Sequence, residues 1–280
     1  MKKILTLFFA TAGRIFTKTA ARVFLNLFTK PPGRAFREPH LALKAAAVET
    51  TTMVSSYAFD RTETGVRTYI WGTGNKTVLL LHGWAGSAVD FGAMVNMLVE
   101  EGYRVVSFDQ PAHGFSEGKN TNLVQWIHII RQFLRLHDIN IVIAHSLGGL
   151  AATIALAREQ KRVSHHILIA PLISSIWAFE DAFRQLRIGE PVSTLVPQMV
   201  LKDYKEDVRT LDLPTHIGNV QAEQVLLIYD TTDAVISVPE TERFLQEHPE
   251  VQACRITAEG HYRIIRDDEV LLRIKNFLLS

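Results

Sequence analysis

The stretch IVIAHSLGGLAATIALA, residues 141–157, joins two kinds of apolar sequence through a single serine. Its first five residues are typical of a buried strand, and its alanine-rich second half is typical of a helix. Ser146 therefore lies where a strand turns into a helix, between the small residues Ala144 and Gly148. Such a turn holds its central residue clear of the sheet, and the start of the following helix favours negative charge. We interpret Ser146 as a nucleophile, with a helix N-cap as the alternative.

Outward from this junction, short apolar strands alternate with helical stretches, from about Ser55 to the last residue. This alternation predicts an α/β fold, with a mostly parallel sheet covered by helices on both faces. An opening hairpin is expected over 57–61 and 65–72. Further strands are expected at 76–83, 103–111, 139–146, 163–171, 223–233 and 251–257, and helices at 91–102, 122–138, 147–160, 238–248 and 267–280.

The alternation is interrupted after Pro171 by broken helical pieces without a strand. We interpret residues 171–220 as a short helical cap, or lid, over the carboxyl ends of the strands. The core then comprises residues 51–170 and 221–280, preceded by a basic segment with its linker at 1–50. The apolar residues of the cap either enclose a substrate or only bury the cap against the core: Ile173, Ile176, Trp177, Phe179, Phe183, Leu186, Leu195, Val196 and Met199.

The composition excludes several classes of protein. The chain has 280 residues, of which 47% are hydrophobic, so it can bury a sizeable core. A formal net charge of +1 argues against nucleic-acid binding through a basic surface. Cys254 is the only cysteine, and the chain lacks a phosphate-binding loop, a dinucleotide-binding glycine motif and a zinc-helix motif. The sequence therefore predicts neither a cofactor nor a metal.

The charge is distributed unevenly along the chain. The first fifty residues contain nine Lys/Arg and two acidic residues, and residues 1–30 contain no acidic residue at all. Residues 1–30 have the pattern of one basic amphipathic helix that ends at Pro31 and Pro32. Such a helix either contacts a membrane surface or packs across the protein. The expected location is cytoplasmic, with peripheral membrane contact; a secretory signal leading to the periplasm or the exterior is the alternative.

Five stretches resemble the α/β-hydrolase superfamily, to which esterase-like and lipase-like serine hydrolases belong. LLLHGWAGS (79–87) is similar to the family's His-Gly loop, SFDQPAHGFSEG (107–118) to its Asp-x-Pro-Gly loop, and IAHSLGG (143–149) to its nucleophile elbow. DTTDAVIS (230–237) and AEGHYR (258–263) resemble the turns that carry the acid and the histidine. Ala144 and Ala112 stand where the family pattern has glycine.

The resemblance implies a catalytic triad in which Ser146 is the nucleophile, Asp233 the acid and His261 the general base. Asp230 is the alternative acid, because it ends the strand that Asp233 follows three residues later. The resemblance also implies an oxyanion hole formed by the backbone N–H groups of Trp84 and Leu147.

These residues together predict a serine hydrolase that cleaves a carboxylic ester of a small or acyl-chain substrate through an acyl-enzyme. A thioesterase, lipase or acyltransferase at a membrane surface would use the same groups. A catalytically silent binding protein on a hydrolase scaffold is an alternative from a different class. The expected partners are a small-molecule ester or acyl substrate and a membrane surface in contact with residues 1–30, without nucleic acid.

Overall fold

The computed structural model describes residues 2–257 and 260–280. Met1 of the N-terminal segment, and Ala258 and Glu259 of the stretch that resembles the histidine turn, lie outside the described residues.

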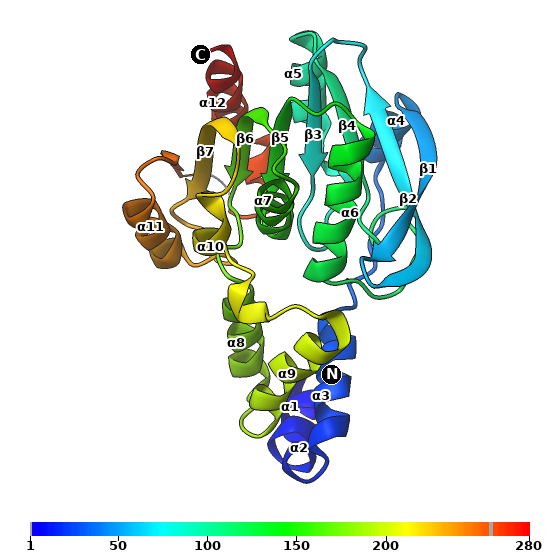
Figure 1. Ribbon diagram of the computed structural model, residues 1–280, viewed down its shortest axis with the longest axis vertical. Coiled ribbons are helices and arrows are strands. Elements are labelled where there is room, and N and C mark those ends of the chain that lie inside the picture. The colour runs from blue at the N-terminus through cyan, green and yellow to red at the C-terminus, as the bar shows by residue number, and fades with distance from the viewer. Residues whose placement is uncertain (1, 258–259) are drawn as a thin grey trace.

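One eight-stranded sheet forms the centre of the described chain (Figure 1). Its order is β1-β2-β4-β3-β5-β6-β7-β8, and β2 alone runs against the other strands. The predicted mostly parallel sheet is confirmed. The strands are β1 (Val48–Tyr57), β2 (Asp60–Trp71), β3 (Thr77–Leu81), β4 (Arg104–Phe108), β5 (Ile141–His145), β6 (Val163–Ile169), β7 (Ala222–Asp230) and β8 (Gln252–Ile256).

Helices cover both faces of this sheet because its central strands are apolar on both sides. Along β5, Val142 and Ala144 point into one core, whereas Ile141 and Ile143 point into the other. The first core is covered by α6 (Leu123–Leu136), α7 (Leu147–Glu159), α10 (Leu213–Ile217) and α11 (Val238–Glu247). The second is covered by α4 (Glu38–Ala45), α5 (Gly92–Glu100) and α12 (Asp268–Leu279), together with the short 3₁₀ turns η1 (Ala88–Phe91) and η3 (Ile264–Arg266).

A helical lobe lies below the sheet in Figure 1. The segment between β6 and β7 contributes α8 (Ser175–Leu186), α9 (Val192–Tyr204) and the 3₁₀ turn η2 (Val208–Thr210) to it. The N-terminal segment contributes the helices α1 (Lys2–Ala10), α2 (Ala12–Ile15) and α3 (Thr17–Phe28). Parts of the chain far apart in sequence therefore share one lobe, which we call the lower lobe.

The prediction of a single helix over residues 1–30 is wrong, because the segment is broken at Thr11 and Phe16 into three helices. The breaks fold the segment back on itself. In one continuous helix, Phe9 and Phe24 would lie about 22 Å apart, whereas their ring centroids are 6.4 Å apart in the structure. Both rings are buried in the lower lobe, so tertiary packing overrides the local helical pattern.

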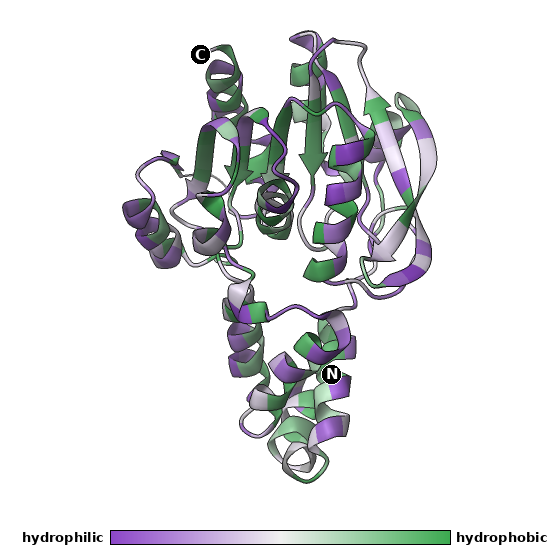
Figure 2. Ribbon diagram, in the orientation of Figure 1, coloured by the Kyte–Doolittle hydropathy of each residue, from purple (hydrophilic) through white to green (hydrophobic). Residues whose placement is uncertain are grey.

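Most of the apolar face of α3 packs against the segment between β6 and β7. The ring of Phe24 lies 4.9 Å from that of Phe183, and the ring of Phe28 stacks on that of Phe179 at 4.6 Å. Figure 2 shows the hydrophobic faces of these helices turned toward one another. The N-terminal segment thus packs on the protein, as one of the two sequence interpretations expected. No helix within 2–257 and 260–280 combines the length and apolar character needed to cross a bilayer.

Candidate active site

Ser146 occupies the sharp turn between β5 and α7. Its φ of 56° and ψ of −125° are strained for a residue with a side chain. The surroundings hold this conformation in place: the Ser146 N–H donates to the carbonyl of Ile169 at 3.0 Å, and its own carbonyl accepts from Gly149 and Leu172. The Ser146 side chain makes no capping hydrogen bond to α7, so the N-cap alternative does not describe it.

Two glycines allow the loop after β3 to approach this turn closely. A Cβ on Gly83 would lie 2.7 Å from the Cβ of Ser146, and a Cβ on Gly148 would lie 2.4 Å from the carbonyl oxygen of His82. Either contact would push the loop and the turn apart. At the other small position, Ala144 is completely buried, so its methyl group is accommodated in the core beneath the turn.

The structure brings Ser146, His261 and Asp233 together as one hydrogen-bonded series. The distance from His261 Nε2 to Ser146 Oγ is 2.9 Å, and that from His261 Nδ1 to Asp233 Oδ2 is 2.7 Å. A carboxylate only accepts hydrogen bonds, so the proton is on Nδ1 and Nε2 accepts from the serine hydroxyl. The side chains of His261 and Asp233 are each 3% exposed. The imidazole is therefore oriented to take a proton from the serine.

The Asp233 carboxylate is held ionised by its hydrogen bonds. Burial alone would raise its pKa, but hydrogen bonds from His261, Val235 and Ile236 outweigh burial and lower the pKa below its usual value. The two backbone N–H groups reach Asp233 Oδ1 at 2.7 and 2.9 Å. A charged carboxylate fixes the orientation of the imidazole and favours its protonated form.

Asp230, the alternative acid, has other partners. Its Oδ2 accepts from the N–H of Gly260 at 2.9 Å, and its Oδ1 accepts from both the N–H and the hydroxyl of Thr232. Within the described ranges it makes no hydrogen bond with His261. The carboxylate thus ties the acid turn to the histidine turn, and Asp233 is the acid that contacts the imidazole.

The two predicted oxyanion donors are the N–H groups of Leu147, which directly follows Ser146, and of Trp84, which follows Gly83 in the loop that approaches Ser146. In the part of the chain that the structure describes, neither donates to another protein group. The loop that carries Trp84 is held by His113, whose Nε2 accepts from the N–H of Ala85 at 3.1 Å. Ala85 has a φ of 61°, so the chain reverses immediately after Trp84. Both N–H groups remain available for a negatively charged oxygen.

His145 and Asp109 support the loops around the site. His145 donates from Nε2 to the carbonyl of His261 at 2.9 Å. The Asp109 carboxylate accepts hydrogen bonds from Ser87, Ala88, Tyr69 and Phe115. Among the described residues, no group of three or more His, Cys, Asp or Glu side chains is arranged to hold a metal ion.

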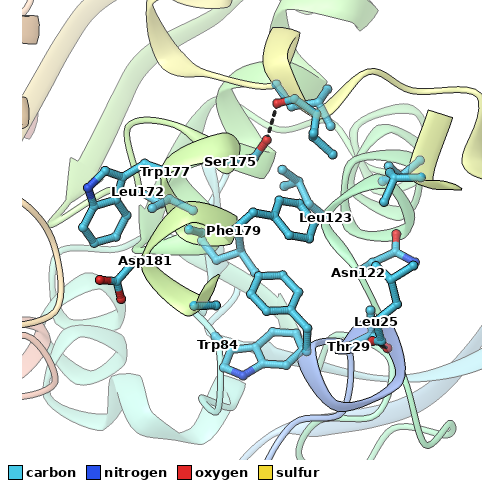
Figure 3. A pocket seen from close by; sticks show the side chains of 18 of the residues that line it. Leu25, Thr29, Trp84, Asn122, Leu123, Leu172, Ser175, Trp177, Phe179 and Asp181 are labelled. Carbon is cyan, nitrogen blue, oxygen red and sulfur yellow. Dashed lines mark hydrogen bonds between the residues drawn. The ribbon is translucent and has the colours of Figure 1, made fainter. Parts of the chain in front are cut away.

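A cavity of about 550 Å³ lies between the sheet and the lower lobe, with Ser146 in its wall. Figure 3 shows side chains from α3, α8 and the loop of Trp84 gathered around it. Its lining is mostly apolar and includes both predicted oxyanion residues, Trp84 and Leu147. Of the expected cap residues, Trp177, Phe179 and Leu186 line the cavity. Others help to form the core of the lower lobe: Ile176, Phe183, Leu195, Val196 and Met199.

Sequence reasoning missed the contribution of α3 to this cavity. Leu25, Phe28 and Thr29 line it, and the carbonyl of Thr29 accepts from the N–H of Thr121 at 2.8 Å. The side-chain amide of Asn120 also donates to the carbonyl of Asn26. The apolar spacing of α3 indicated that one face would be buried, but it carried no signal for the partner.

The strand order, the serine turn and the helices on both faces define the α/β-hydrolase fold, and the chain has this fold. Residues 76–193 match the family model described as alpha/beta hydrolase fold. The α/β-hydrolase fold that the five stretches implied is confirmed.

Solved structures with similar folds include an esterase of Pyrococcus furiosus, with 21% identity, a TM-score of 0.62, and coverage of 89% of this chain and 96% of that one. A carboxylesterase of the ammonia-oxidizing thaumarchaeon Nitrososphaera gargenis has 18% identity and a TM-score of 0.57, covering 81% of this chain and 98% of its own. A thioesterase domain from the curacin biosynthetic pathway has 15% identity and a TM-score of 0.56, covering 83% of this chain and 100% of its own. By sequence, none of the curated proteins matches the chain.

Acid is expected to destabilise the protein through four buried histidines. Burial lowers the pKa of His82 and His166 to about 4, and that of His113 and His145 to about 3. In an unfolded chain a histidine titrates near 6.5, so below that pH the unfolded state binds more protons. The free energy of unfolding therefore keeps its full value above about pH 6.5 and decreases toward pH 4. The loss at pH 5 is up to ~2 kcal/mol per histidine.

Thermal unfolding followed by circular dichroism between about pH 7 and pH 5 measures this effect. The variant His166→Gln keeps a polar partner for the hydroxyl of Thr153, which lies 2.9 Å from His166 Nε2, and should show a shallower pH dependence. A melting temperature that stays constant over this range would contradict the expectation.

Proposed function

We propose that the protein is a serine hydrolase that cleaves carboxylic esters with an apolar acyl chain. The observation that carries the proposal is the hydrogen-bonded series from Asp233 through His261 to Ser146 at the wall of a mostly apolar cavity. A serine hydroxyl is a weak nucleophile, and an adjacent base oriented by a carboxylate is the arrangement that activates it.

In the first half of the proposed reaction, Ser146 Oγ attacks the ester carbonyl carbon while His261 Nε2 takes the hydroxyl proton. The carbonyl oxygen becomes negative and accepts hydrogen bonds from the N–H groups of Trp84 and Leu147. When the tetrahedral intermediate collapses, the bond to the alcohol oxygen breaks. His261 then gives its proton to the leaving alcohol, and the acyl group remains on Ser146.

In the second half, water attacks the acyl carbon and gives a proton to His261 Nε2. The same two N–H groups stabilise the second tetrahedral intermediate. Its collapse breaks the bond to Ser146 Oγ, which recovers the proton from the imidazolium. The products are the free acid and the regenerated serine. Asp233 stays ionised throughout and stabilises the imidazolium.

The cavity supports an apolar acyl chain as the part of the substrate that is recognised. A volume of about 550 Å³ lies within the range of ordinary ligand pockets. Side chains such as Leu25, Phe28, Trp177 and Phe179 offer apolar contact to a chain extending from the serine. A chain buried there gains stability with each methylene removed from water.

The length of acyl chain that is hydrolysed tests this proposal, because filling the cavity should exclude long chains. Ala182 lines the cavity from α8, and Ala182→Phe adds a ring to that wall. We expect kcat/KM for p-nitrophenyl laurate to fall by about tenfold or more, and that for the acetate to stay within about threefold of wild type.

Glu180→Phe is the matched control, because Glu180 is exposed on the same helix. It should leave the chain-length profile unchanged. A wild-type protein without hydrolysis of any ester in the series would refute the proposed function. An unchanged laurate rate in Ala182→Phe would refute the acyl-chain assignment of the cavity.

A further inference from the structure

Four large apolar side chains of the N-terminal segment are left exposed on α1 and around the junction of α2 and α3. Ile4 and Leu7 on α1 are 73% and 66% exposed, and Ile15 and Phe16, at the junction of α2 and α3, are 78% and 60% exposed. Their neighbours Phe9 and Phe24 are buried, so the segment is anchored by one set of apolar residues while it exposes another. We call these four exposed residues the apolar tip.

The apolar tip lies far from the sheet. In Figure 1, α2 lies at the end of the lower lobe that is opposite the strands, and α1 runs toward that end from the middle of the lobe. Gly13 on α2 is buried against the start of α9. A Cβ at this position would lie 3.6 Å from the Cγ2 of Val192, so α2 packs on α9. The tip is therefore a surface held by the fold.

The charge of this segment is entirely of one sign. Residues 1–37 contain eight Lys/Arg and no Asp/Glu, and Lys3 and Lys18, beside the apolar tip in sequence, are both exposed. If two copies of the chain met through their tips, these like charges would be brought together, which disfavours a dimer. An anionic bilayer supplies the opposite charge and an apolar layer beneath it.

We propose that the apolar tip docks onto an anionic lipid bilayer, with its four apolar side chains in the interface and Lys3 and Lys18 against lipid headgroups. At nine residues, α1 is much too short to span a bilayer and fits a helix that lies on the surface. This proposal does not depend on the proposed hydrolase activity.

The docking would place the cavity close to the bilayer. The twelve residues of α3 run from Thr17, next to the apolar tip, to Phe28 in the cavity wall. A helix of that length spans about 18 Å. A lipid-derived substrate would therefore have a short distance to travel between the bilayer and the cavity.

Co-sedimentation with lipid vesicles tests the proposal. The wild-type chain should bind vesicles of mixed phosphatidylcholine and phosphatidylglycerol, and bind much less to pure phosphatidylcholine or at high salt. The double variant Ile15→Glu/Phe16→Glu should reduce the partition coefficient by about tenfold or more. The variant Ile4→Glu/Leu7→Glu tests the other half of the tip independently, and circular dichroism verifies folding of each variant.

The matched control is Leu136→Glu/Leu272→Glu, which adds the same charge at two positions on core helices that are 61% and 56% exposed. Its partition coefficient should stay within about twofold of the wild-type value, once the two added negative charges are allowed for. Absence of wild-type binding, or equal loss in the control, would overturn the proposal. A wild-type dimer that the tip variants dissociate, seen by sedimentation velocity, would assign the tip to a second copy instead.

Discussion

Ser146→Ala should abolish ester hydrolysis, lowering kcat by a factor on the order of 10⁵, while the fold is retained. The variant removes the only oxygen within hydrogen-bond distance of His261 Nε2 that the described residues provide, so no acyl-enzyme can form. The same substitution should eliminate covalent labelling by a fluorophosphonate probe, because the probe reacts with an activated serine. Hydrolysis of p-nitrophenyl butyrate and gel fluorescence after labelling measure the two effects.

Ser175 supplies a matched control for this result. It also lines the cavity, but its hydroxyl donates to the carbonyl of Val208 at 2.5 Å, and among the described residues it makes no hydrogen bond with a histidine. Ser175→Ala should keep its labelling and a turnover within about fivefold of wild type. Labelling that persists in Ser146→Ala would show that another residue is the nucleophile. A wild-type protein that neither turns over nor labels would point to a silent binding protein.

Asp233→Asn should lower kcat by about 10³- to 10⁴-fold with little change in KM. An amide next to His261 Nδ1 removes the negative charge that favours the imidazolium, and its N–H₂ group can turn the imidazole into the wrong tautomer. The substitution is nearly isosteric, so a loss of this size would reflect the charge and the tautomer. Steady-state kinetics on a short-chain ester provide the measurement.

Asp230→Asn gives the comparison that decides between the two carboxylates. Asp230 is fully buried and bonds to the backbone of Gly260, so its replacement should lower the melting temperature. Its effect on kcat should stay within about tenfold, because the hydrogen bonds of Asp230 in the described part of the chain go to Thr232 and Gly260 and not to the imidazole. If Asp230→Asn is the slower enzyme and Asp233→Asn is close to wild type, the acid has been assigned to the wrong residue.

The core of the fold could be predicted from the sequence because its signals are local. Central strands such as β3 and β5 are short, apolar throughout and bounded by turn residues. The first strand was placed less well: β1 begins at Val48, whereas the expected hairpin began near Tyr57. As an edge strand it has exposed polar residues such as Thr50 and Thr51, so its pattern resembles a loop.

The candidate site was predictable for a related reason. Ser146, Asp233 and His261 each lie in a turn that follows a strand, and the carboxyl ends of parallel strands meet at one edge of a sheet. The resemblance favoured Asp233 over Asp230 as the acid, but the physical reason needed the structure, since it depends on which carboxylate faces Gly260 and which faces the imidazole. The position of α3 in the cavity wall could not be predicted from the sequence either, because an apolar helix face does not specify its partner.

Because α3 contributes to the cavity, the catalytic groups and part of the ligand-contacting surface come from different parts of the sequence. The reactive groups come from the sheet turns, whereas part of the surface that would recognise a ligand comes from Leu25, Phe28 and Thr29 near the start of the chain. Mutations in this opening segment could redirect the range of ligands accepted while leaving the chemistry untouched.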